Sequence, residues 1–288
     1  MTLLFALVRA IHFASLTTVF GASALLAQAR RIGVTDEHLR KTLMAAAWAT
    51  PASAILWLCF VGGEMTGDAA AGFEPSVAAT VIAHSFYGHV FLARVVPLIG
   101  LALLCLRGGG YALKAVVAGL ALAGLGLTSH AASAGSPQSG YLGAAIDALH
   151  LLAAGFWIGG LVVIMPQIVP RIRDTARLVA LLTMFSRWGV VSVAVLIAAG
   201  TANAVFILDM PGMAWSGTYV TWLAVKIVLA GLMVALALTN RFGVLPALAR
   251  GDREARDTIP LTVLAELGAA LLILMIVGIL GLTAPMQM

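Results

Sequence analysis

Residues 141–165, which read YLGAAIDALHLLAAGFWIGGLVVIM, form a long apolar run that is interrupted by one carboxylate, Asp147, and one imidazole, His150. A helix needs about 20 mostly apolar residues to cross the roughly 30 Å of hydrocarbon in a bilayer, because its backbone must satisfy its own hydrogen bonds there. This run is long enough to meet that requirement. It therefore predicts a membrane-spanning helix.

The composition of the whole chain agrees with a membrane protein. Of its 288 residues, 61% are hydrophobic and only 10% are charged, with a mean hydropathy of +1.04, whereas a soluble domain is about 45–50% apolar and about 25% charged. The chain is expected to be all-α, a polytopic helix bundle forming a single transmembrane domain over residues 1–288. About eight transmembrane helices are predicted, near 2–29, 40–63, 77–106, 111–133, 141–165, 178–208, 217–240 and 258–283.

The charged residues predict an orientation. Arginine and lysine gather in or beside the predicted loops 30–40, 107–111, 166–177 and 241–257, whereas loops 64–76, 134–140 and 209–216 contain neither. By the positive-inside rule the basic loops face the cytoplasm, so both termini are expected to be periplasmic. The net charge of +5 then reflects topology, and neither nucleic acid nor nucleotide is an expected partner.

Several candidate metal ligands share the outer half of the predicted membrane region. A polar side chain at membrane depth is costly unless it has a partner or a task, and imidazole is the commonest metal-ligating side chain. Thioether sulfur, combined with imidazole, suits Cu(I). Ordinary packing remains the alternative for each residue. The predicted ligands are His12, His84, His89, His130, His150, Met210 and Met213.

Other polar residues within the apolar runs are predicted to orient these ligands or to line a pathway. Asp147 lies one helical turn before His150 and is expected to accept its second ring N–H. Arg94 and Lys226 lie deep in their runs, and Glu266 lies toward the cytoplasmic half. Each of these three is either part of a permeation path or a member of a structural ion pair.

The stretch 147–161, DALHLLAAGFWIGGL, resembles the signature of the copper resistance protein D (CopD) family, in which a histidine is followed seven residues later by Trp-x-Gly-Gly. Here these residues are His150, Trp157, Gly159 and Gly160. Further stretches resemble the family in the same order, namely RAIHFASL with His12, SHAAS with His130, FSRWGVVSVAVLIAAGTANA with Gly200 and Asn203, the segment with Lys226, and TNRFGVLPAL with Asn240 and Arg241. A departure is Tyr219-Val220, where the family has Tyr-Gly.

The resemblance implies a multi-pass protein of the bacterial cell inner membrane that is not an enzyme and that handles a copper ion, Cu(I) or Cu(II). It also implies a periplasmic copper carrier of the CopC type as a partner, in addition to the lipid bilayer. We therefore expect copper to bind at the outer histidines and to be imported. Two alternatives stay open: a b-type haem redox protein, since paired membrane histidines also hold haem iron, and a copper-delivery factor that does not transport.

Overall fold

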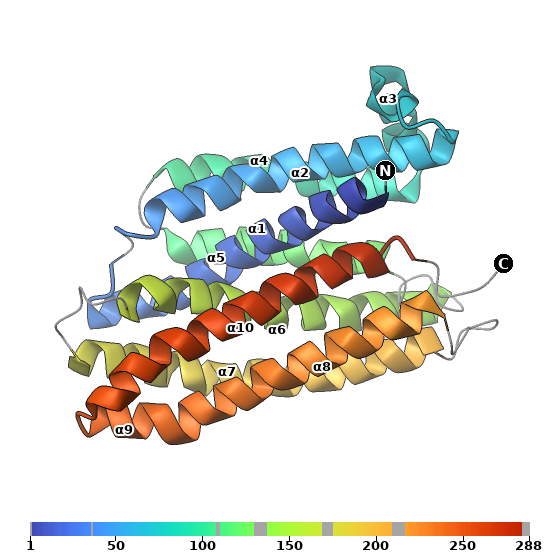
Figure 1. The fold of residues 1–288 in the computed structure, drawn as a ribbon. Coiled ribbons are helices and arrows are strands. Elements are labelled where there is room, and N and C mark those ends of the chain that lie inside the picture. The colour runs from blue at the N-terminus through green and yellow to red at the C-terminus, as the bar shows by residue number, and fades with distance from the viewer. Residues whose placement is uncertain are drawn as a thin grey trace.

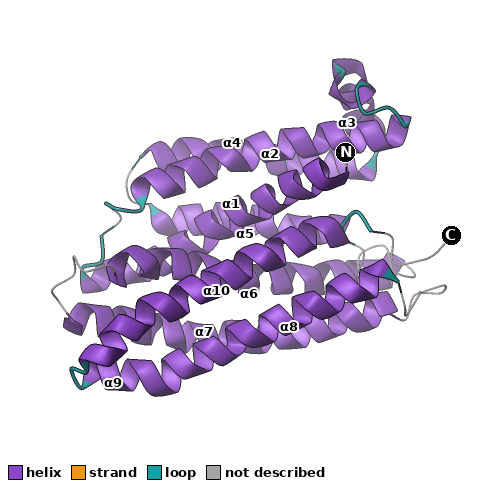
Figure 2. Ribbon diagram, in the orientation of Figure 1, coloured by secondary structure: helices purple, strands orange, loops and turns teal. Residues whose placement is uncertain are grey.

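The computed structural model describes residues 2–35, 37–107, 110–129, 137–168, 175–208 and 217–283. All regular structure in these ranges is helical (Figure 2). Eight segments are long and apolar enough to cross a membrane, which confirms the predicted polytopic bundle. The helices are α1 (Thr2–Ala29), α2 (Arg40–Thr66), α3 (Pro75–His84), α4 (Phe86–Leu106), α5 (Tyr111–Ala123), α6 (Pro137–Ile168), α7 (Thr175–Leu208), α8 (Thr218–Thr239), α9 (Leu245–Ala249) and α10 (Arg253–Leu280). Short 3-10 turns η1 (Arg30–Ile32), η2 (Ala71–Phe73) and η3 (Gly124–Thr128) and a π-helical segment η5 (Asn240–Val244) complete the set.

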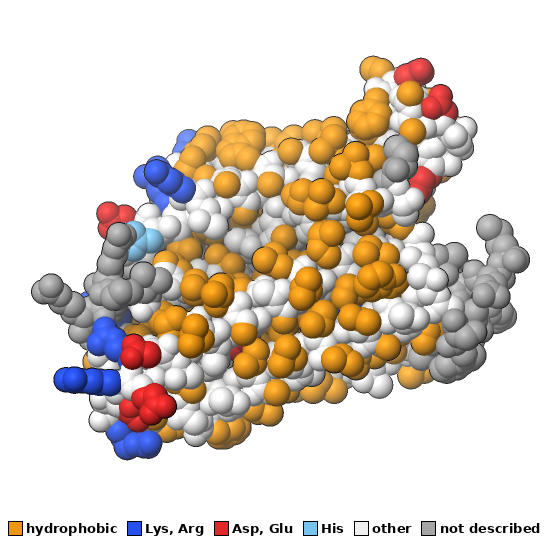
Figure 3. Space-filling view, viewed as in Figure 1, with side chains coloured by type: hydrophobic (Ala, Val, Ile, Leu, Met, Phe, Trp, Pro, Cys, Tyr) orange, Lys and Arg blue, Asp and Glu red, His pale blue; other side chains and the backbone are white. Residues whose placement is uncertain are grey.

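The long helices run side by side, and α1 begins at the same end of the bundle at which α10 ends (Figure 1). Helix α1 is central, packing against α2, α5, α6 and α10. Lysine and arginine side chains gather at the end that holds α9, and apolar side chains cover the surface between the two ends (Figure 3). We call the α9 end the inner end, because the positive-inside rule assigns it to the cytoplasm, and the opposite end the outer end.

One predicted helix is divided in the structure. The prediction of a continuous helix over 77–106 is wrong, because the extended backbone of Ser85 separates α3 from α4. The Ser85 hydroxyl accepts a hydrogen bond from the Gly88 backbone nitrogen at 2.9 Å and so caps the start of α4. Gly88 is needed here, since a Cβ atom would collide with the backbone of Val81 and Ile82. Helix α3 therefore projects beyond the bundle at its outer end (Figure 1).

Helices α1 and α6 meet through glycines. A Cβ atom on Gly159 of α6 would lie 2.6 Å from the Cα atom of Gly21 and 2.7 Å from the Thr17 carbonyl oxygen of α1. Small residues allow membrane helices to approach closely, which gains van der Waals contact that lipid cannot supply better. This close approach fixes the face of α6 that carries the polar residues described below.

Replacing Gly159 with alanine should destabilise the protein by about 1–3 kcal/mol, because the added methyl group meets rigid backbone. The measurement is the unfolding temperature of the purified protein in detergent. Gly231→Ala is the matched control, since the space around Gly231 is open and alanine favours a helix by about 1 kcal/mol over glycine. Equal unfolding temperatures for the two variants would contradict the proposed tight crossing.

Candidate functional site

A cavity of about 220 Å³ lies in the outer half of the bundle among α1, α6, α7, α8 and α10. We call it the outer cavity. On α6, residues 147, 150, 151, 154 and 158 line it, which is the spacing of a single helical face. Most of its lining is apolar. Its charged or strongly polar lining residues include Arg9, Asp147, His150, Asn203 and Lys226.

Three buried atoms of the residues that line the outer cavity have no hydrogen-bond partner among the described residues: Arg9 Nε, His150 Nδ1 and Asn203 Oδ1. The Asn203 amide is oriented by its other end, because Nδ2 donates to Asp147 Oδ1 at 2.9 Å. Gly200 leaves room for the imidazole, since a Cβ atom there would lie 3.3 Å from His150 Nδ1. Buried polar atoms in proteins are nearly always paired, so three such atoms in one cavity indicate a place for a ligand.

The expected hydrogen bond between Asp147 and His150 is not formed, because the carboxylate of Asp147 turns toward Asn203 of α7. The cavity also receives two cationic side chains, Lys226 from α8 and Arg9 from α1. The Arg9 guanidinium lies over the Trp57 ring, 4.3 Å from its centroid. Asp147 is the one carboxylate in the lining, which is too few oxygen ligands for a hard ion such as Ca²⁺, since that ion takes six to eight. Neutral imidazole nitrogen instead suits a transition metal.

His12 lies in a separate, fully buried cluster. Its Nε2 is 2.8 Å from a terminal nitrogen of Arg94, and because guanidinium only donates, Nε2 accepts and Nδ1 carries the proton. Nδ1 then faces the Ser53 hydroxyl at 3.0 Å and the Thr50 carbonyl at 3.2 Å. The Nε atom of Arg94 donates to the Ala121 carbonyl at 2.9 Å. With both ring nitrogens engaged, His12 offers no free lone pair to a metal in this arrangement.

The remaining predicted ligands are not gathered with His150. His84 and His89 are exposed and lie on either side of the break between α3 and α4. Among the described residues, no group of three or more histidine, cysteine, aspartate or glutamate side chains is arranged to hold a metal. His130, Met210 and Met213 lie outside the described residues, so their role as ligands stays a prediction.

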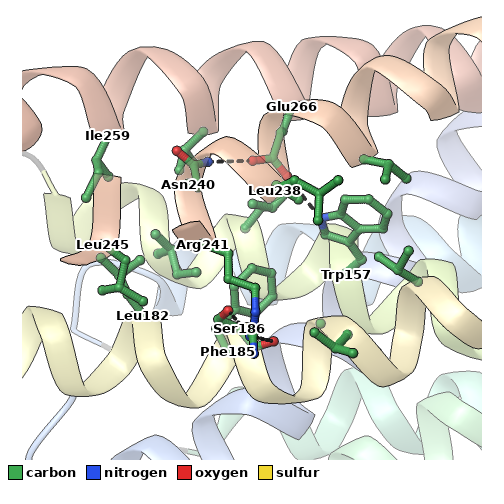
Figure 4. Close-up of a pocket in the computed structure, with 18 of the residues that line it drawn as sticks. Trp157, Leu182, Phe185, Ser186, Leu238, Asn240, Arg241, Leu245, Ile259 and Glu266 are labelled. Atoms are coloured by element: carbon green, nitrogen blue, oxygen red, sulfur yellow. Dashed lines mark hydrogen bonds between the residues drawn. The ribbon is translucent and has the colours of Figure 1, made fainter. Parts of the chain in front are cut away.

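A second polar network lies deeper toward the inner end and is centred on Glu266 of α10, which is only 2% exposed. Trp157 Nε1 donates to one carboxylate oxygen at 3.0 Å, and Asn240 Nδ2 donates to the other at 2.8 Å (Figure 4). The Thr262 hydroxyl donates to Asn240 Oδ1 at 2.7 Å. This network borders a larger cavity of about 350 Å³, which we call the inner cavity.

Sequence reasoning missed three functional candidates that the structure brings to these cavities. Asn203 and Asn240 supply the amides that hold Asp147 and Glu266, and Arg241 lines the inner cavity. Each was noticed only within the family resemblance. The sequence did offer a signal for the two asparagines, because an amide inside an apolar run is costly without a partner.

The fold and the outer cavity define a multi-pass helical membrane protein with a partly polar cavity in the outer half of the bundle. Two family models match the chain: "Copper resistance protein D-like, N-terminal domain" over residues 1–144 and "Copper resistance protein D" over residues 179–280. The chain belongs to the copper resistance protein D family. This confirms the resemblance drawn from the sequence.

Two curated relatives extend this comparison. The chain is 34% identical over 215 residues to the copper resistance protein D of Pseudomonas syringae pv. tomato, covering 69% of this chain and 68% of that protein. It is 29% identical over 295 residues to the inner membrane protein YebZ of Escherichia coli (strain K12), covering 96% and 97% of the two chains. No solved structure matches the chain.

Replacing Trp157 with phenylalanine should cost about 1–3 kcal/mol of stability, because it keeps most of the ring but leaves a buried Glu266 oxygen without its donor. The measurement is chemical or thermal unfolding in detergent. Trp188→Phe is the matched control: its indole also donates a hydrogen bond, to Gln28 at 3.0 Å, but its side chain is 48% exposed. A loss of stability in the Trp188 variant equal to that in the Trp157 variant would contradict this account of the Glu266 network.

Proposed function

We propose that this protein accepts copper in the outer cavity from the periplasmic side of the bacterial inner membrane and imports it. The observation that carries the proposal is the pair of buried, unpartnered atoms His150 Nδ1 and Asn203 Oδ1 in one cavity. Family membership supplies the identity of the cargo, and the cavity supplies a place for it. Copper is a transported substrate here, not a resident cofactor.

In this proposal His150 is the first protein ligand, because imidazole binds copper readily. Asp147 is the second candidate and is held in position by Asn203. His130 follows Ser129 directly in the chain, and Ser129 lines the outer cavity, which supports His130 as a further ligand. Met210 and Met213 remain proposed sulfur ligands on the outer side. A periplasmic carrier of the CopC type is the proposed donor, in line with the family.

The stacking of the two cavities supports a route across the membrane, and the inward direction is taken from the family. The same four helices, α6, α7, α8 and α10, line both of them. On α6 the lining extends from Asp147 to Ile164, which is about 25 Å at 1.5 Å per residue and approaches the thickness of the hydrocarbon. Trp157 and Glu266 lie on the inner part of this route, as proposed pathway residues. Lys226 balances the charge of Asp147 at its outer part.

The size of the outer cavity favours an ion over haem. Pockets for ligands of drug size are about 300–1,000 Å³, and this cavity of about 220 Å³ is smaller. His150 is also the only histidine among the described residues that lines it.

The alternative of copper delivery without transport rests on a different observation. Both carboxylate oxygens of Glu266 are already hydrogen-bonded, so the inner side of the route is closed in this arrangement.

Replacing His150 with alanine should weaken copper binding by about tenfold or more, which corresponds to at least roughly 1.4 kcal/mol for one lost ligand. The measurement is competition with a colorimetric Cu(I) chelator, using protein in lipid nanodiscs. His38→Ala is the control, because His38 is exposed at the inner end. Equal copper affinity and stoichiometry in the wild type and the His150 variant would contradict the site. A Soret band in the absorption spectrum of the same samples would instead support haem.

Right-side-out membrane vesicles that contain the wild-type protein should accumulate copper, and His150→Ala vesicles should accumulate it several times more slowly. The measurement is the initial rate of uptake of a copper isotope, compared with vesicles lacking the protein. Binding without accumulation would favour the delivery role. Accumulation confined to inside-out vesicles would overturn the proposed direction.

A further inference from the structure

The inner cavity lies in a gap between two helices that are consecutive in the chain. Helices α7 and α8 make almost no direct contact: α7 packs on α6 and α9, and α8 packs on α10. The inner cavity fills this gap and is backed by α6 and α10. Its rim includes Val190, Ile197 and Leu238, which are 49%, 58% and 50% exposed. The cavity therefore opens sideways, through a surface that faces lipid in a membrane.

The π-helical segment Asn240–Val244 places a cation at the mouth of this cavity. This segment continues α8, and both Asn240 and Arg241 line the cavity. One terminal nitrogen of Arg241 donates to the Ser186 hydroxyl at 2.6 Å and to the Ser186 carbonyl at 3.0 Å. Figure 4 shows the guanidinium directed at Ser186 of α7. The side chain is thereby anchored across the gap.

The other donors of Arg241 remain available. Among the described residues, neither its Nε nor its second terminal nitrogen has a hydrogen-bond partner, and it forms no ion pair. The neighbouring carboxylate of Glu266 is already paired with Trp157 and Asn240. Arg241 is thus a guanidinium with free donors beside an apolar cavity.

Arg241 lies toward the inner end of its membrane span. The candidate span runs from Thr218 to Ala249, and Arg241 is in the inner third of it. At 1.5 Å per residue it lies roughly 35 Å from Thr218, which compares with about 30 Å of hydrocarbon and brings it within reach of the inner headgroups. Anionic lipids in that leaflet are attracted to basic residues there.

We propose that the inner cavity binds one anionic phospholipid of the cytoplasmic leaflet. The phosphate accepts hydrogen bonds from the free donors of Arg241, whose fork matches two phosphate oxygens. One acyl chain lies between α7 and α8 against the apolar lining. A helix of a second copy does not fit, because a helix with side chains is about 10–12 Å wide and the cavity is about 350 Å³. The proposal does not depend on copper.

The bound lipid would complete the wall of the bundle. Without the lipid, the Trp157–Glu266 network would face the hydrocarbon of the bilayer through the gap between α7 and α8. An acyl chain in that gap keeps the interior apart from the bulk bilayer. Arg241 holds the chain in place through its phosphate.

The test is lipid binding to the purified, delipidated full-length protein, measured by native mass spectrometry. The probes are dioleoyl phosphatidylglycerol, dioleoyl phosphatidylcholine and inorganic phosphate. The wild type should bind phosphatidylglycerol at least about tenfold more tightly than phosphatidylcholine, because both lipids carry the phosphate but the quaternary ammonium of choline offsets its charge and repels Arg241. Inorganic phosphate at millimolar concentration should not displace it.

Two variants test the two parts of the site. Arg241→Gln should abolish the preference for phosphatidylglycerol, whereas Arg31→Gln, an exposed arginine at the inner end, should retain it. Gly189→Leu should fill the groove, because Gly189 lines the cavity and has open space around it, and should weaken binding of both lipids. Gly231→Leu, also in open space, is its control. Unchanged binding in Arg241→Gln or Gly189→Leu, or displacement by inorganic phosphate, would overturn the proposal.

Discussion

Water is scarce in the hydrocarbon core of a bilayer, so each polar side chain placed there needs a partner within the protein. His12 meets this requirement through Arg94 and α2, and Glu266 meets it through Trp157 and Asn240. The residues that line the outer cavity depart from it at three atoms, of Arg9, His150 and Asn203. The proposed function rests on this contrast between satisfied and unsatisfied groups.

Much of the fold followed from the lengths of the apolar runs. The expected helix at 2–29 matches α1, and the eight expected spans have counterparts in the structure. The break at Ser85 was missed because hydropathy does not register one capping hydroxyl beside a glycine. The π-helical turn after Thr239 was not predicted either, because the local sequence is compatible with an uninterrupted α-helix.

The site was less predictable than the fold, because the role of each polar side chain depends on its hydrogen-bond partners on distant helices. His12 and His150 both stand in apolar runs near the outer end, and the one local difference, Asp147 one turn before His150, predicted a hydrogen bond that is not formed. Arg94, which forms a hydrogen bond with His12, is 82 positions from it in the sequence. Asn203, which forms a hydrogen bond with Asp147 in place of His150, is 56 positions from Asp147. Sequence alone could therefore locate both imidazoles but could not tell which of them is already occupied.

The central position of α1 bears on how the chain assembles in the membrane. Helix α1 precedes the other described helices in the chain, yet it packs against α10, which follows them, and Gly278 of α10 lies directly on the backbone of Ala6. One face of α1 therefore stays without its α10 partner while the helices between them are synthesised. During that interval α1 can already pack on α2, α5 and α6, and the arrival of α10 closes the bundle around it.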